Sequence, residues 1–210
     1  MTDALRAGID DLRLGIDDAA QEKLLAYVAL LEKWNRTHNL TAIRDRGQMI
    51  THHLLDSLAV LPHVPAHAGL RVADVGSGGG LPGIPLAIAR PDWSVTLIDS
   101  SHKKAAFLNQ AVIELTLPNV EVVAARVEDV APAHPFDVVM SRAYASLCTF
   151  VTQSERLLAR DGRWIAMKGA VPHDEVAALP ADVRVEATPA LRVPGIVGER
   201  HLVIMKAAKP

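Results

Sequence analysis

Hydrophobic positions recur along the chain with two different spacings, and the change falls near residue 66. In residues 17–37 apolar side chains recur every three or four positions, which predicts an amphipathic helix. Residues 49–61 repeat this spacing, and Pro62 then ends the second predicted helix. We therefore expect residues 1–66 to form an N-terminal helical extension that packs on a domain made by residues 67–210.

From residue 70 onward, short apolar runs alternate with helical patterns. Alternation of this kind predicts an α/β fold, with a mostly parallel seven-stranded sheet and helices on both faces. The last two strands have no helical pattern between them and are expected to form a closing hairpin. The expected strands are 70–74, 94–99, 120–124, 136–141, 162–168, 183–188 and 199–206, and the expected helices of this domain are 82–90, 101–115 and 147–160.

A glycine-rich stretch, Asp-Val-Gly-Ser-Gly-Gly-Gly-Leu-Pro-Gly, joins the first expected strand to its helix. A dinucleotide fingerprint starting at Gly76 needs glycine or alanine where Leu81 stands. Asp74, at the start of the stretch, would repel a pyrophosphate but suits a ligand with an ammonium and a sulfonium, such as S-adenosylmethionine. Asp99 ends the next strand about 20 residues past Gly78, where an acid can bind both ribose hydroxyls. The spacing therefore favours an S-adenosylmethionine site over a nicotinamide site.

Charged residues follow the ends of five successive expected strands. Because the carboxyl ends of parallel strands meet at one edge of a sheet, these side chains should share one rim. Two acids would serve a cationic cofactor, and three neighbouring cations indicate a phosphate-bearing substrate. The alternative is that the three cations are unrelated solvated or ion-paired side chains. The five residues are Asp74, Asp99, Arg126, Arg142 and Lys168.

Composition adds further limits. The chain has 210 residues, is 50% hydrophobic and carries a net charge of −2, which permits a nucleic-acid partner without demanding one. Its single cysteine, Cys148, favours a reducing compartment, and we see neither a signal peptide nor a bilayer-spanning segment. No cluster of histidines and cysteines has metal-ligand spacing. We expect a cytoplasmic protein, without metal or membrane association, that acts as a monomer.

The loop after the fourth expected strand indicates which methyl acceptors are disfavoured. Methyltransferases that act on exocyclic base amines usually carry an Asn/Asp-Pro-Pro-aromatic loop there, but this chain has Ser-Arg-Ala-Tyr. Cys148 follows Leu147 rather than proline, which disfavours a cytosine C5 nucleophile. An acceptor with a free lone pair, such as guanine N7, needs no general base, so proximity and in-line alignment would supply the catalysis. We then assign Arg142 to phosphate or cofactor rather than to N7.

Several ordered motifs resemble the RsmG (GidB) family of bacterial 16S ribosomal RNA guanine-N7 methyltransferases. The resemblance implies a Rossmann-like class I S-adenosylmethionine-dependent methyltransferase fold. It also implies methyl transfer to N7 of guanine 527 in 16S RNA, with S-adenosylhomocysteine as product. The resemblance covers residues 24–206 and departs from the family at Leu81, where the family often has phenylalanine. The motifs are Asn39-Leu40-Thr41, His53-x-x-Asp56-Ser57-Leu58, the glycine-rich stretch from Asp74 to Gly83, Lys103 to Leu108, Arg126-Val127-Glu128, Ser141-Arg142-Ala143 and Lys168-Gly169.

The resemblance also implies site residues. Cofactor contacts, beyond Asp74, would come from Gly76, Gly78 and Leu81 at the methionine part, Asp99 at the ribose, Val127 and Glu128 at the adenine, and Arg142 beside the cofactor. No residue acts as a general base, and Arg142 and Asn39 are candidates for positioning. His53 and Asp56 could instead tie the helical extension to the sheet domain. RNA contacts would come from Asn39, His53, Asp56, Lys103, Arg126 and Lys168.

Three other functions compete with this one. A methyltransferase for a small molecule or protein would share the cofactor site. A nicotinamide-dependent oxidoreductase is disfavoured by Asp74 and Leu81. A non-catalytic RNA-binding factor on the same fold would bind RNA without the cofactor. The sequence leaves open whether the substrate is free 16S RNA, the small ribosomal subunit or its precursor.

Overall fold

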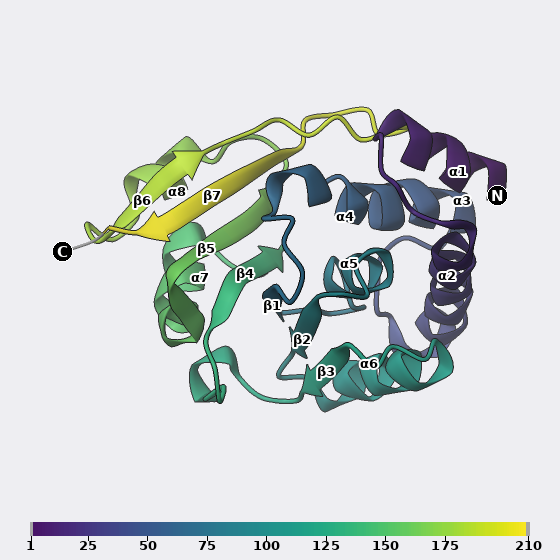
Figure 1. The fold of residues 1–210 in the computed structure, drawn as a ribbon, viewed down its shortest axis with the longest axis horizontal. Coiled ribbons are helices and arrows are strands. Elements are labelled where there is room, and N and C mark those ends of the chain that lie inside the picture. The colour runs from purple at the N-terminus through teal and green to yellow at the C-terminus, as the bar shows by residue number, and fades with distance from the viewer. Residues whose placement is uncertain (1, 209–210) are drawn as a thin grey trace.

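A seven-stranded sheet forms the centre of the molecule in a computed structural model that describes residues 2–208 (Figure 1). Residues 1, 209 and 210, at the ends of the two expected units, lie outside the described residues. The strand order is β3-β2-β1-β4-β5-β7-β6, and of these seven strands only β7 runs in the direction opposite to the other six. All seven expected strands are confirmed. They are β1 (Arg71–Val75), β2 (Ser94–Ile98), β3 (Val120–Val123), β4 (Phe136–Arg142), β5 (Leu158–Lys168), β6 (Val183–Ala187) and β7 (His201–Ala207).

Both faces of the sheet are covered by helices, as the continuous apolar runs of its central strands require. Successive residues point to opposite faces, so Val72 joins one hydrophobic cluster and Ala73 the other. One cluster includes residues of α2 (Asp18–His38), α5 (Gly83–Ala89) and α6 (His102–Glu114), and the other packs α7 (Leu147–Ser154) on the sheet. In Figure 1 the N-terminal helices lie on the α5 side, while α7 lies by β4 and β5.

The N-terminal helices share a hydrophobic cluster with the sheet. Leu5 of α1 (Thr2–Asp11), Leu24 of α2 and Val72 of β1 are all fully buried in it. Asp17 caps α2 by accepting a hydrogen bond from the N–H of Ala20 at 2.7 Å. The helical extension therefore packs on the sheet, while its division from the rest as a separate folding unit stays a prediction.

The second expected helix, 49–61, is not one regular helix. The chain forms α3 (Arg46–Met49), the π-helix η1 (Ile50–Leu55), α4 (Asp56–Leu58) and the 3₁₀-helix η2 (Leu61–His63). In η1 the N–H of Asp56 reaches back five residues to the carbonyl of Thr51. The wider turn leaves the carbonyl of His52 able to accept a hydrogen bond from Arg142 at 3.0 Å.

The expected helix 147–160 is wrong after Ser154. Helix α7 ends at Ser154, a 3₁₀ turn η4 (Glu155–Leu157) follows, and β5 starts at Leu158. Ser154 is fully buried, and its hydroxyl donates to the carbonyl of Phe150 at 2.6 Å and accepts from Trp164 Nε1 at 3.0 Å. Back-bonding by serine competes with the helix and bends its end toward the sheet. The short helix α8 (His173–Ala177) had no signal in the sequence.

Replacing Tyr27 by phenylalanine tests how the helical extension supports the glycine-rich loop. Tyr27, fully buried in α2, donates its hydroxyl proton to the carbonyl of Gly79 at 2.5 Å. Removing this bond leaves the carbonyl unpaired, so we expect Tyr27→Phe to lose about 1–2 kcal/mol of unfolding free energy. We also expect weaker S-adenosylmethionine binding. Urea unfolding and titration calorimetry would measure both, and a variant equal to wild type in both would contradict this role.

Candidate active site

The loop after β1 brings its backbone close to open space. Gly76 and Gly78 have φ angles of 70° and 59°, a left-handed conformation that favours glycine. A Cβ atom on Gly78 would meet nothing closer than the carbonyl oxygen of Gly76, 3.8 Å away, so it would project into the cavity that Gly78 lines. A Cβ atom on Gly76 would lie 2.5 Å from the Tyr144 ring. The loop therefore forms a cradle that a side chain would fill.

Asp99 holds this cradle from the end of β2. Its carboxylate accepts one hydrogen bond from the N–H of Gly78 and another from the N–H of Ser101, each at 2.9 Å. Lys104 Nζ lies 3.7 Å from the same carboxylate. Each oxygen retains a lone pair, and Asp99 lines the first cavity, where a ribose diol could donate to it.

Asp74 fixes the far end of the glycine-rich loop through a hydrogen bond. It is fully buried, and its Oδ2 accepts a hydrogen bond from the N–H of Gly83, the first residue of α5, at 3.0 Å. Burial raises the pKa of Asp74 to about 6, although the Gly83 N–H, the Ser77 hydroxyl and the charge of Arg142 each lower it. Asp74 lines neither cavity described below, so the expected direct contact with a cofactor stays a prediction.

Two adjoining cavities lie at the carboxyl ends of the parallel strands. The first, about 350 Å³, extends from β1 over β2 and β3, and the second, about 720 Å³, extends from the glycine-rich loop toward β4, β5 and β7. They share Gly76, Lys104 and Ala143, and together form one trough. Of the expected site residues, the first contains Asp99, Arg126, Val127 and Glu128, and the second Gly78, Leu81, His53, Asp56, Arg142 and Lys168.

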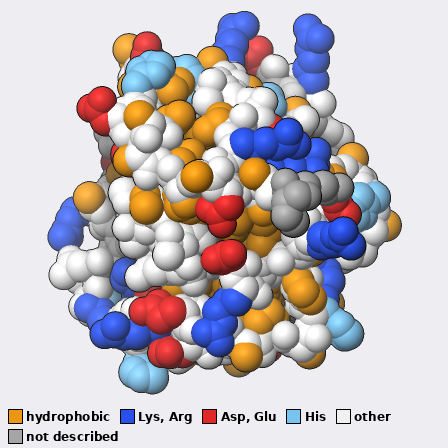
Figure 2. Space-filling model, turned by 90° about the vertical axis from the view of Figure 1, so that its left-hand side faces the viewer, with side chains coloured by type: hydrophobic (Ala, Val, Ile, Leu, Met, Phe, Trp, Pro, Cys, Tyr) orange, Lys and Arg blue, Asp and Glu red, His pale blue; other side chains and the backbone are white. Residues whose placement is uncertain are grey.

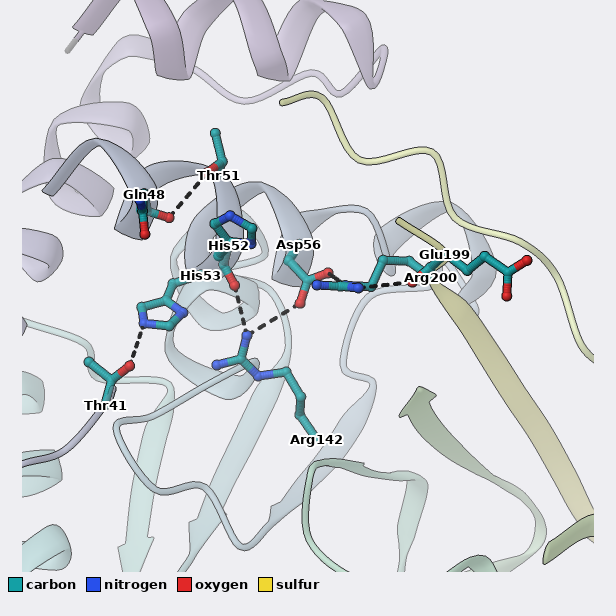
Figure 3. Close-up of polar contacts among 9 residues, drawn as sticks. All are labelled: Thr41, Gln48, Thr51, His52, His53, Asp56, Arg142, Glu199 and Arg200. Atoms are coloured by element: carbon teal, nitrogen blue, oxygen red, sulfur yellow. Dashed lines mark hydrogen bonds and ion pairs between the residues drawn. The ribbon is translucent and has the colours of Figure 1, made fainter. Parts of the chain in front are cut away.

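Asp56 organises the second cavity. Only 6% of its side chain is exposed, and each of its oxygens contacts one arginine. Arg142 Nη1 lies 3.3 Å from Oδ2, and Arg200 Nε lies 3.2 Å from Oδ1. In Figure 3 the carboxylate of Asp56 lies between the two guanidinium groups. This arrangement ties the N-terminal segment to β4 and to the start of β7, as one reading of the sequence expected for Asp56.

His53, beside this cluster, is 5% exposed. Its Nε2 lies 2.9 Å from the Thr41 hydroxyl, while its Nδ1 has no hydrogen-bond partner among the described residues. Burial and the nearby charge of Arg142 lower the pKa of His53 to about 4. The imidazole is therefore neutral at pH 7 and a weak base, suited to hydrogen bonding rather than to proton transfer.

Two of the expected RNA contacts lie outside both cavities. Asn39, the left-handed C-cap of α2, is exposed, and its Oδ1 accepts from Arg44 Nη2 at 3.4 Å. Lys103 is exposed in the first turn of α6. Lys168 lines the second cavity, where its Nζ lies 2.9 Å from a Glu175 oxygen. The three cations that the sequence placed on one rim all line the trough, with Arg126 in the first cavity and Arg142 and Lys168 in the second.

Sequence reasoning missed residues at the start of β7. Arg200 and His201 line the second cavity because β7 is antiparallel, so its first residues lie at the edge where the parallel strands end. In the β5–β7 register His201 lies opposite Lys168. The predicted closing hairpin was the signal that could have placed them. Tyr144, which lines the first cavity, was also missed.

The described residues offer neither a metal site nor a membrane-spanning helix. Residues 2–208 contain no group of three or more His, Cys, Asp or Glu side chains placed to hold a metal ion. Among the helices described in the structure, none is long and apolar enough to cross a membrane.

The chain is similar in sequence to a family of known enzymes. The model of the family described as rRNA small subunit methyltransferase G matches residues 20–203. A Laribacter hongkongensis protein named ribosomal RNA small subunit methyltransferase G is 53% identical over 203 residues, 97% of this chain and 97% of that protein.

Solved structures are similar in fold. A mutant of MtNAS in complex with S-adenosylmethionine matches with a TM-score of 0.62 at 16% identity, over 87% of this chain and 73% of that one. A ribosomal protein L11 methylase from Lactobacillus delbrueckii matches with a TM-score of 0.56 at 17% identity, over 74% of this chain and 77% of that one. Together with the strand order, these likenesses confirm the expected class I methyltransferase fold.

Asp99→Asn should weaken S-adenosylmethionine binding at least about tenfold. One asparagine cannot accept from both Gly78 and Ser101, because its amide nitrogen would face an N–H donor. Asp92→Asn is the matched control, since Asp92 is an exposed residue outside both cavities. Titration calorimetry measures both variants. Wild-type affinity in Asp99→Asn would show that this carboxylate does not support the cofactor site.

Asp74→Asn should change how stability depends on pH. The folded pKa near 6 exceeds the ordinary value of 3.8, so the wild-type contribution of Asp74 to stability falls as pH rises from about 4 to 6. The full change is roughly 3 kcal/mol at most. His53 titrates in the same range in wild type and in Asp74→Asn, so the difference between their unfolding free energies isolates the effect of Asp74. Urea unfolding at several pH values tests this, and parallel curves would contradict it.

Proposed function

The chain belongs to the rRNA small subunit methyltransferase G family, and we propose that it methylates N7 of guanine 527 in 16S ribosomal RNA. It is an S-adenosylmethionine-dependent rRNA methyltransferase, on the strength of the family match over most of its length. The choice of atom and nucleotide is the proposal. The observation that carries it is a second cavity beside the glycine-rich loop, lined by the hydrogen-bonding side chains of His53, Asp56 and Arg142.

The trough fits S-adenosylmethionine in its chemistry. We assign the ribose to Asp99, the adenine to the first cavity beside Val127 and Glu128, and the methionine part to the backbone of Gly76 and Gly78. When bound, S-adenosylmethionine supplies an electrophilic methyl group on a sulfonium. The further cofactor contacts that we propose are Leu81 and Arg142, which line the second cavity, and Asp74, which acts through the loop that it holds.

Guanine N7 suits the acceptor end of the trough. Its lone pair needs no deprotonation, so the protein has only to hold the base in line with the reactive methyl. The product ring is cationic, and a neutral His53 adds no charge to oppose it. Arg142 is directed away from N7 by Asp56 and the His52 carbonyl, which leaves it a positioning role. Asn39, at the end of α2, is the other positioning candidate.

The RNA would reach the second cavity past polar and basic side chains. We propose contacts from His53, Asp56 and Lys168 inside the cavity, from Arg126 at the edge of the first cavity, and from the exposed Asn39 and Lys103. We further propose that the enzyme works as a cytoplasmic monomer on the small ribosomal subunit or its precursor.

The described residues expose little apolar surface that could form a dimer interface. Ile113 and Val197 are the large hydrophobic residues exposed within residues 2–208. The face at the β6 end of the sheet carries interspersed acidic and basic side chains rather than one broad apolar patch (Figure 2). These observations favour the monomer.

The direct test uses small ribosomal subunits from cells that lack this gene. Subunits are incubated with the enzyme and methyl-labelled S-adenosylmethionine, cleaved at 7-methylguanosine with borohydride and aniline, and mapped by primer extension. We expect a single new stop at guanine 527, and a weaker stop with Asp99→Asn when S-adenosylmethionine is limiting. Label without cleavage would contradict the N7 assignment. Label on a small molecule or protein alone would contradict the RNA substrate.

A further inference from the structure

We propose that Arg200 and Arg142, bridged by Asp56, form a binding site for a phosphodiester group of the RNA beside the methylated guanine. The proposal rests on the RNA methyltransferase function above and adds Arg200 as a substrate contact. The ligand class is an oxyanion with a single negative charge, held by two guanidinium groups in the second cavity.

The position of Arg200 separates it from the residues that we assign to the ribose and the adenine. Asp99 and Glu128 follow β2 and β3, whereas Arg142 ends β4 and Arg200 immediately precedes β7. In the sheet, β4, β5 and β7 are consecutive neighbours on the other side of β1. The two arginines therefore lie at the end of the trough that the acceptor must occupy.

Each arginine is anchored on one side only. Arg200 uses Nε for Asp56 and Nη1 for the carbonyl of Glu199, and Arg142 uses Nη1 for Asp56 and His52. The remaining N–H groups of both make no hydrogen bond within residues 2–208. A guanidinium has five donors in a fixed fork, so anchoring through Asp56 orients the unused donors for a second anion.

The charges at this end also favour an anion. Asp56 supplies one negative charge between two positive ones, and Lys168 is paired with Glu175. The side chains of Arg142 and Arg200 are only 21% and 31% exposed, so solvent screens their excess positive charge incompletely. A phosphodiester would supply the second negative charge.

The cofactor carboxylate is the other source of an anion. It would have to reach across the second cavity from the glycine-rich loop to Arg200. Arg200 instead follows an exposed segment that includes Val197 and Gly198. An adjoining exposed segment favours a large ligand that also extends over the surface, as RNA does.

Arg200→Gln tests the site through salt dependence. Losing one phosphate contact should make the plot of log(1/KM) for small subunits against log[KCl] less steep by about 0.7–0.9. KM at low salt should rise about tenfold, with kcat changed by less than about twofold. Arg192→Gln is the matched control, because Arg192 is an exposed residue of the same segment that lines neither cavity.

Two further variants separate a phosphate contact from a structural role. Asp56→Asn breaks the same ion pair but keeps both cations in the cavity, and the salt slope counts charges rather than hydrogen bonds, so the slope should not become less steep. Arg200→Lys keeps the charge and should keep the wild-type slope even if Arg200→Gln unfolds. A reduced slope in either variant, or an unchanged slope in folded Arg200→Gln, would overturn the proposal.

Calorimetry distinguishes the two anions. S-adenosylmethionine and 5′-methylthioadenosine, which lacks the carboxylate, should bind Arg200→Gln as tightly as wild type. A loss confined to S-adenosylmethionine would assign Arg200 to the cofactor carboxylate and overturn the RNA assignment. Failure of wild type to methylate small subunits would instead count against the proposed function.

Discussion

The glycine-rich loop after β1 has almost no side chains of its own to fix its shape, so its conformation depends on hydrogen bonds from groups outside it. Asp74 binds the N–H of Gly83 at one end, Asp99 binds that of Gly78 in the middle, and Tyr27 binds the carbonyl of Gly79. Two of these groups come from strand ends and the third from an N-terminal helix. The cofactor site thus depends on the helical extension as well as on the sheet.

A second constraint shapes the acceptor end. Asp56 contacts Arg142 and Arg200, which follow it in the chain by 86 and 144 positions. The three side chains meet at the carboxyl ends of the parallel strands. Breaking one partner of such a buried pair costs more than the pair contributes to stability, because the remaining charge is left uncompensated. The π-helix serves the same arrangement, since it frees the His52 carbonyl for Arg142. Shape and charge at the acceptor end therefore rest on one carboxylate.

The sequence predicted the parts of the structure that follow from local pattern and parallel-strand geometry. Glycine spacing and the position of Asp99 predicted the cradle, and the strand ends predicted that Arg142 and Lys168 share an edge. The π-helix was not predictable, because helical periodicity in residues 49–61 looks the same until a tertiary partner selects a wider turn. Arg200 was missed because it precedes a strand, and only the antiparallel direction of β7 brings it to the site. The sequence predicts Asp74 as a cofactor ligand, and that contact stays a prediction, while the hydrogen bond from the Gly83 N–H to its carboxylate is a contact that the sequence did not predict.

A structure of the enzyme on a small ribosomal subunit, with S-adenosylhomocysteine bound, would test the central claim most directly. We expect guanine 527 in the second cavity, with N7 facing the sulfur and His53 beside the base. We also expect the adenosine in the first cavity, at Asp99. A different nucleotide in the second cavity, or guanine 527 presenting another atom to the sulfur, would contradict the proposed function.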